Sequence, residues 1–77
     1  MTAVYLTRVD KDRNMARYYV MSVQPTLFGE WSVVREWGRI GRGGQVRLGN
    51  YRDPDDAKAA IANLQQSKIR RGYSAAR

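Results

Sequence analysis

Residues 31–51 read WSVVREWGRIGRGGQVRLGNY, and this stretch decides the fold. Trp31–Arg39 contains two tryptophans and two valines, which favour a strand, and Gln45–Tyr51 is the next strand that the sequence predicts. The connection Gly41-Arg42-Gly43-Gly44 is rich in glycine, the residue that most easily adopts the positive φ angles of tight hairpins. The stretch therefore predicts an antiparallel hairpin in the middle of the chain.

Two more strands are predicted on the N-terminal side of this hairpin. Thr2–Val9 alternates between two faces, and the polar turn residues 10–14 follow it. Met15–Gln24 is a second run of aromatic and β-branched residues. Pro25 and Gly29 then indicate a turn before Trp31.

The chain ends in a predicted helix. Asp53 is placed to cap it, Pro54 suits its first position, and acids follow where the positive end of the helix dipole favours them. Small and apolar residues recur at helical spacing and give one narrow stripe for the sheet: Ala57, Ala60, Ile61 and Leu64. The sequence thus predicts an α+β fold, in which a small antiparallel sheet of four or more strands is covered on one face by a C-terminal helix. One domain spans residues 1–77.

The alternation of Trp31–Arg39 also makes a prediction about which face the helix covers. Trp37 falls on one face together with Arg35 and Arg39, and Val34 falls on the other. We expect the helix to cover the face that holds four apolar residues: Val34, Ile40, Val46 and Leu48. Trp37 would then lie away from the helix beside two arginines, although a tryptophan in a small sheet is more often a core residue.

The charge is strongly basic and unevenly distributed. The net charge is +7, and residues 37–52 contain four arginines and no acid. Eleven of the fourteen basic residues are arginine, whose planar group suits phosphate contacts and stacking on flat rings. This balance favours nucleic acid as a partner.

Several functional classes are disfavoured by what the chain lacks. It has no cysteine and no histidine, so thiolate and imidazole metal ligands and the most common general base are missing. No serine has a histidine to activate it. We therefore predict no enzyme activity, no metal site and no cofactor. No apolar run approaches 18 residues, which favours a soluble cytoplasmic protein without a membrane partner.

The motif Trp37-Gly38-Arg39, continued as far as Gln45, resembles the signature of the WGR domain family. Arg17-Tyr18-Tyr19 lies where that family has a basic residue followed by two aromatics, and Lys68–Tyr73 resembles its helix end. The resemblance covers about residues 3–73. The family occurs in several poly(ADP-ribose) polymerases and in bacterial proteins, some of them short.

The resemblance implies DNA binding without catalysis. In the polymerases this domain grips DNA near a break, with the motif tryptophan against the sugar at a strand end. Trp37 would take that packing role, and Arg39 would contact phosphate or a neighbouring domain. Arg17 matches a basic position beside the DNA, and Tyr73 matches the aromatic at the helix end. Ala16 stands where DNA-gripping members often have asparagine, which removes one polar contact.

The sequence therefore predicts a non-catalytic module that binds the DNA backbone or DNA ends with little sequence specificity. Single-stranded nucleic acid or RNA is a variant of this hypothesis, because a ring beside arginines stacks on many bases. The alternative is a protein-interaction module that docks an acidic partner through the same surface. The candidate binding residues are Arg17, Trp37, Arg39, Arg42, Arg47, Lys68, Arg70, Arg71 and Tyr73.

Overall fold

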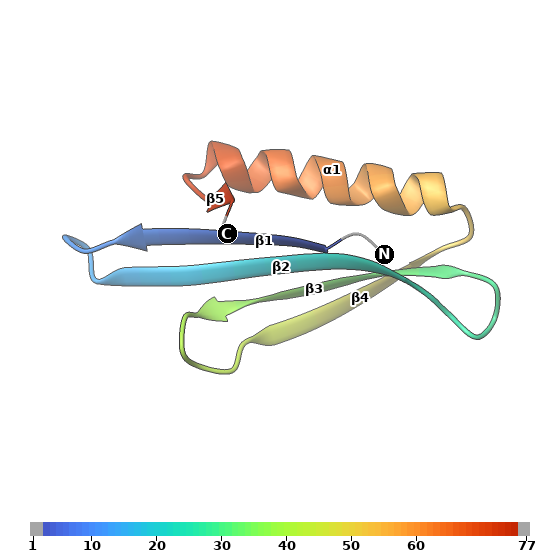
Figure 1. Cartoon of the computed structure of the whole chain (residues 1–77), viewed down its shortest axis with the longest axis horizontal. Coiled ribbons are helices and arrows are strands. Elements are labelled where there is room, and N and C mark those ends of the chain that lie inside the picture. The colour runs from blue at the N-terminus through green and yellow to red at the C-terminus, as the bar shows by residue number, and fades with distance from the viewer. Residues whose placement is uncertain (1–2, 76–77) are drawn as a thin grey trace.

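A five-stranded antiparallel sheet forms one layer of the molecule, and a single helix lies along one of its faces (Figure 1). The computed structural model describes residues 3–75. The strand order is β4-β3-β2-β1-β5, so each of the four long strands lies beside its neighbour in the chain. The bounds are β1 (Ala3–Asp10), β2 (Met15–Pro25), β3 (Trp31–Arg39), β4 (Gln45–Tyr51), α1 (Pro54–Arg70) and β5 (Ser74–Ala75).

The predicted fold class is confirmed, and the four predicted strands appear close to their expected bounds. Thr2, where the first strand was expected to begin, lies outside the described residues. The turn between β2 and β3 is held by the Thr26 hydroxyl, which accepts hydrogen bonds from the backbone N–H groups of Phe28 and Glu30. Gly29 completes this turn at a φ of 78°.

Helix α1 begins and ends as its sequence predicts. The Asp53 side chain accepts a hydrogen bond of 2.9 Å from the backbone nitrogen of Asp55, and Pro54 occupies the first turn. At the other end Gly72, at a φ of 98°, reverses the chain, and its backbone nitrogen donates to the carbonyl of Ile69. These two ends fix the length of the helix along the sheet.

The short strand β5 is a feature that the sequence did not indicate. Once Gly72 has turned the chain back, Ser74 and Ala75 pair with Thr7 and Leu6 of β1. Two residues carry no periodic pattern, so this pairing follows only from where the helix ends. It leaves β4 and β5 as the outer strands of the sheet.

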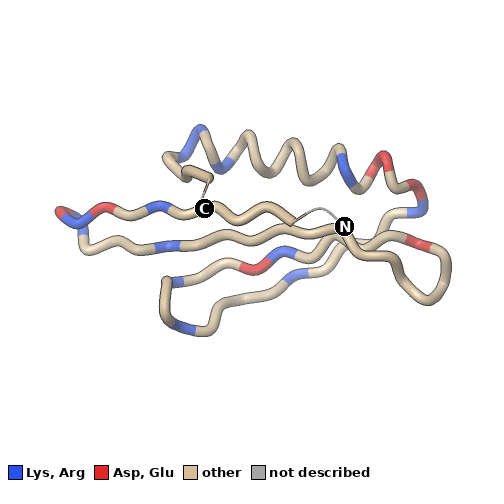
Figure 2. The backbone as a smooth tube through the Cα atoms, in the orientation of Figure 1, with Lys and Arg blue, Asp and Glu red and all other residues tan. Residues whose placement is uncertain are grey.

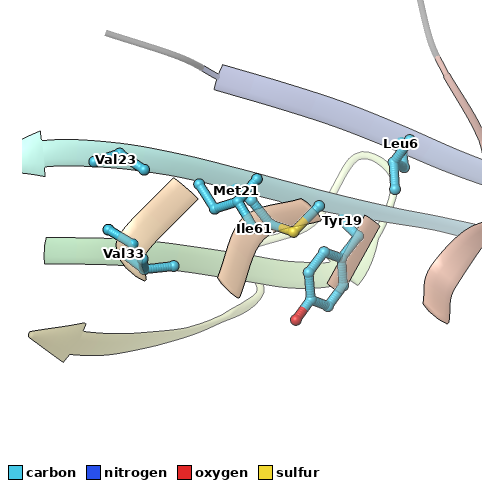
Figure 3. Close-up of a cluster of buried hydrophobic side chains, with 7 residues drawn as sticks. Leu6, Tyr19, Met21, Val23, Val33 and Ile61 are labelled. Carbon is cyan, nitrogen blue, oxygen red and sulfur yellow. The ribbon is translucent and has the colours of Figure 1, made fainter. Parts of the chain in front are cut away.

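The core lies between α1 and the middle of the sheet (Figure 3). Strand β2 supplies Tyr19, Met21 and Val23, and its neighbours and the helix supply the other buried members of the cluster: Leu6, Val33, Ala57 and Ile61. Leu6 and Met21 are completely buried. Helix residues Ala60 and Leu64 pack at the edge of this cluster, as the apolar stripe predicts.

The prediction about which face the helix covers was wrong. Val33, Trp31 and Trp37 pack in or against the core beneath α1, so this face of β3 is the covered one. Val46 and Leu48, expected under the helix, are 59% and 64% exposed on the opposite face. The physical reason is that both faces of β3 and β4 contain apolar residues, so alternation alone could not choose between them. Val34 and Ile40 likewise lie outside the core cluster.

Candidate nucleic-acid interface

A hollow of about 570 Å³ lies on the helix side of the sheet, at the end where the last turn of α1 meets β1, β2 and β3. Positive and aromatic side chains dominate its lining, and none of the residues that line it is acidic. The lining residues are Arg8, Arg17, Tyr19, Trp37, Gly38, Arg39, Lys68, Arg71 and Tyr73.

Three of these arginines lie side by side across three strands. In the register of the sheet, Arg8 of β1 is directly opposite Arg17 of β2, and Arg17 is directly opposite Arg39 of β3. Directly opposed residues share a face, and like charges in such positions repel each other. Among residues 3–75 the only ion pair joins Arg13 to Asp10, so no carboxylate neutralises this row. The fold therefore maintains a concentrated positive charge at this site.

The aromatic residues form a cluster behind the arginines. The rings of Tyr19 and Trp37 are stacked, with centroids 5.8 Å apart and planes 15° from parallel. Tyr73 meets Tyr19 edge-on at 6.4 Å. Trp37 is only partly buried, so it packs against the core and also lines the hollow. The packing and binding interpretations of this tryptophan are therefore compatible.

Lys68 lies over the aromatic cluster. Its Nζ is 4.5 Å from the ring centre of Tyr19 and 5.9 Å from that of Tyr73, which are cation–π distances. Burial lowers the pKa of Lys68 below its ordinary value, and the nearby charges of Arg71 and Arg35 lower it further. A cation that is partly desolvated and repelled by its neighbours gains more than an ordinary surface lysine when an anion approaches.

Arg39 is held in place by the turn between β1 and β2. Its Nη1 donates to the backbone carbonyl of Asn14 at 3.2 Å, and its Nη2 lies 3.5 Å from the Asn14 Oδ1. Asn14 lies in the turn between β1 and β2 and adopts a φ of 52°, a left-handed conformation that asparagine tolerates better than most residues. Arg39 forms no ion pair with Glu36 or Glu30. Glu36 falls on the opposite face of β3, where it accepts a 2.6 Å hydrogen bond from the Tyr18 hydroxyl.

Gly38 is required by a close approach of two backbones. A Cβ on Gly38 would lie 2.8 Å from the Cα of Gly44, on the return path of the β3–β4 hairpin. A Cβ on Gly44 would overlap the carbonyl oxygen of Trp37. The two glycines therefore let the hairpin close tightly beside Trp37, a packing role that requires no phosphate contact. Of the hairpin glycines, only Gly41 has a positive φ.

The structure gathers six of the nine predicted binding residues in the hollow and leaves three outside it. Arg42 lies in the exposed β3–β4 turn, Arg47 is exposed on the outer strand β4, and Arg70 is exposed on the last turn of α1. None of these three lines the hollow. The six that do are Arg17, Trp37, Arg39, Lys68, Arg71 and Tyr73.

Three residues that line the hollow are not indicated by the sequence as binding residues: Arg8, Tyr19 and Gly38. Arg8 continues the face of β1 that holds Leu6, but only the pairing register shows that it lies opposite Arg17. The aromatic run Met15–Gln24 predicts that Tyr19 lies in a strand, but it does not indicate that Tyr19 lines a site. Its position directly opposite Trp37 depends on the same register.

The two ends of helix α1 differ in charge (Figure 2). The helix begins at the acidic positions Asp55 and Asp56 and ends at the basic positions Lys68 and Arg70. The hollow thus lies at the basic end of the helix, where its cations also interact favourably with the helix dipole.

The described part of the chain contains no cluster of acidic, histidine or cysteine residues suited to a metal ion. No helix within residues 3–75 is long and apolar enough to cross a membrane.

Two features together identify the class of protein. One is the small α+β fold, and the other is the tryptophan, glycine and arginine at the end of the third strand, beside a basic hollow. The chain matches the WGR domain over residues 2–77, and it belongs to that family. It is also 44% identical over 70 residues to the uncharacterized protein y4dW of Sinorhizobium fredii (strain NBRC 101917 / NGR234). That match covers 91% of this chain but only 34% of the relative. A comparison with solved structures finds no significant match.

Proposed function

We propose that this domain binds DNA through the hollow at the basic end of helix α1, with contacts to the backbone or to a strand end and little base specificity. The observation that carries the proposal is the row Arg8–Arg17–Arg39, three opposed positive charges without a carboxylate among them. A polyanion offsets the repulsion in such a row, because phosphates placed among the arginines turn each repulsive neighbour into an attractive one. The membership in the WGR family, whose known roles involve the binding of DNA breaks, supports the same proposal.

The groups around the row suit a nucleic acid better than a small inorganic anion. Arg8, Arg17 and Arg39 donate to phosphate oxygens, and Lys68 and Arg71 add charge from the helix side of the hollow. The partly exposed ring of Trp37 offers an apolar surface for a sugar or a base. The sheet offers no helix for the major groove, so base readout is not expected.

Two neighbouring arginines on the last turn of the helix provide a matched test. Arg71 lines the hollow and Arg70 does not, although both are exposed and carry the same charge. Arg71→Gln should weaken binding to a labelled duplex by roughly five- to tenfold, about 1 kcal/mol or slightly more. Arg70→Gln should change it by less than about twofold, since only distant, screened charge is lost. The measurement is fluorescence anisotropy of a 5′-phosphorylated duplex, titrated at several salt concentrations.

The salt dependence counts the contacts independently. Five cations in the hollow predict a slope of log affinity against log salt of about −4.5, and Arg71→Gln should make this slope shallower by about one. Equal effects of the two variants would mean that DNA senses only net charge, and the hollow would not be the site. Absence of binding at low salt, together with binding to an acidic protein chain, would favour the protein-interaction alternative.

Competition experiments distinguish the forms of nucleic acid. Unlabelled duplex, single-stranded DNA and RNA of equal length should be compared against the same labelled duplex. If the hollow binds the DNA backbone or a strand end, the blunt duplex should compete best. Stronger competition by single strands would instead indicate stacking of bases on Trp37 as the main interaction.

A further inference from the structure

The face of the sheet that α1 does not cover is nearly free of charge, and a group of exposed apolar side chains lies on it among uncharged polar ones. The pairing register places Tyr5, Val20, Glu36 and Val46 in one row across this face, and Leu48 follows two residues along β4. Tyr5, Val9, Val46 and Leu48 are between 45% and 64% exposed. Four of the eight large hydrophobic residues exposed among residues 3–75 thus belong to this one surface, which we call the open face.

Charge is divided sharply between the two faces of the sheet. Residues of a strand alternate between the two faces of the sheet. All five arginines of β1 to β4, and Asp10, fall on the face that α1 covers, and Glu36 is the one charged residue of these strands on the open face. The carboxylate of Glu36 already accepts the Tyr18 hydroxyl proton at 2.6 Å. Tyr18 in turn stacks on Tyr5, with planes 5° from parallel. In a chain with 27% charged residues, an open face of this composition is suited to contact with protein and not with water.

We propose that the open face is a homodimer interface, in which the sheets of two copies pack face to face with their helices and basic hollows pointing outward. This inference is independent of the proposed DNA binding, because the open face and the hollow lie on opposite sides of the sheet.

The distribution of charge on the chain favours a second copy as the partner that covers the open face. Each copy carries +7, so any arrangement that brought the arginine sides together would be strongly repelled. Contact through the open faces keeps the arginines of the two copies apart and buries a surface on which the single carboxylate is already hydrogen-bonded. The identical face on both partners makes the contact isologous, and it closes at two copies.

The size of the open face is sufficient for a weak but specific dimer. Strands β1 to β4 are 8, 11, 9 and 7 residues long. At about 3.3 Å per residue and about 4.8 Å between strands they cover roughly 550 Å² in projection on each copy. Both copies together then bury about 1,100 Å² or more, close to the lower limit for specific interfaces. We therefore expect a dissociation constant in the micromolar range.

The turn between β2 and β3 offers the competing explanation for any self-association. Leu27 and Phe28 at its tip are 99% and 88% exposed, more than any residue of the open face. A projecting tip, however, contacts a different surface on its partner, and such a contact produces open chains of copies and not a closed pair. The tip is therefore the matched control for the open face.

Sedimentation velocity of the unmodified chain, from about 1 µM to about 1 mM, tests the proposal. The expected result is a monomer–dimer equilibrium. The variant V46K/L48K places four like charges in the dimer and should weaken association at least about tenfold. The control L27K/F28K makes the same exchange at the tip and should change it by less than about twofold. Both pairs are exposed, so circular dichroism should show that both variants fold.

A second measurement needs no substitution. Methyl resonances of the wild-type chain should shift with concentration at Val9, Val46 and Leu48 and stay constant at Leu27. A chain that remains monomeric up to about 1 mM would overturn the proposal, as would methyl shifts confined to Leu27. Loss of association in L27K/F28K, or a continuous series of larger species, would assign the contact to the tip instead.

Discussion

In the row Arg8–Arg17–Arg39, we expect removal of the central charge to stabilise the fold and to weaken the binding of DNA. Arg17 faces a like charge on both neighbouring strands, and such directly opposed pairs each cost about 0.2–1 kcal/mol. Arg17→Gln removes both repulsions at once. Water reaches all three side chains and weakens their repulsion, so we expect a gain of about 0.5–1 kcal/mol in the free energy of unfolding. For a domain of this size that corresponds to a rise of roughly 2–8 °C in Tm.

Thermal unfolding followed by circular dichroism measures this gain. The rise in Tm should be largest at low salt and should shrink toward 1 M salt, where the screening length falls to about 3 Å. Arg42→Gln is the control, because it removes the same charge from an exposed turn with no opposed arginine. Without ligand, Arg17→Gln should be more stable than the wild type; with saturating duplex DNA, the wild type should gain more in Tm than the variant.

A Tm of Arg17→Gln that is lower than that of the wild type at low salt, or raised no more than that of Arg42→Gln, would contradict repulsion between the opposed arginines. The first outcome would mean that the stem of Arg17 contributes packing that outweighs the repulsion. Arg17→Met, which keeps an apolar stem of similar length, would then separate packing from charge.

Two further predictions concern the hairpin and the open face. Gly44→Ala should lower the free energy of unfolding by about 2 kcal/mol or more, because its Cβ would overlap the carbonyl oxygen of Trp37 and the β3–β4 hairpin would have to open. Urea denaturation measures this loss, and Gly43→Ala is the control, because a Cβ on Gly43 would have no atom within 4 Å. Equal losses in the two variants would argue against the close approach at Gly44. The hydrogen bond to Glu36, aided by burial, raises the pKa of Tyr18 above 10.0. The folded chain therefore holds this proton where the unfolded chain releases it, and the resulting stability is present below pH 10.0 and lost as the pH rises through the raised pKa. Tyr18→Phe should remove this part of the alkaline loss of Tm, and an unchanged alkaline profile would contradict the hydrogen bond.

Much of the fold could be predicted from short-range patterns. The cap at Asp53, the proline after it and the glycine at position 72 each act within a few residues, so the helix bounds follow from local chemistry. The strands follow from β-branched and aromatic runs bounded by turn residues. The candidate site was predicted in part for the same reason, because the tryptophan–glycine–arginine motif and the basic helix end are contiguous segments.

The composition of the site depended on which residues face one another across strands. Arg8 lies at the site only because the register places it opposite Arg17. Arg42 and Arg47 were predicted as binding residues because the sequence shows that they are charged but not which way their side chains point, and neither lines the hollow. A residue on a strand has two faces available, and one step in register exchanges them. Sequence alone could therefore supply the charge of the interface but not its arrangement.

By itself the sequence determined the family, the order of the long strands and the helix along the chain, the ends of the helix and the sign of the charge, because each depends on local composition or on a contiguous motif. Only the tertiary structure decided which face of the sheet the helix covers. Trp37 and Val33 occupy one face of β3 and Val34 the other, and both faces are apolar enough to form a core. The helix buries the first of these faces, so the arginine row gathers near its C-terminal end, and apolar residues of the second face such as Val46 and Leu48 remain exposed.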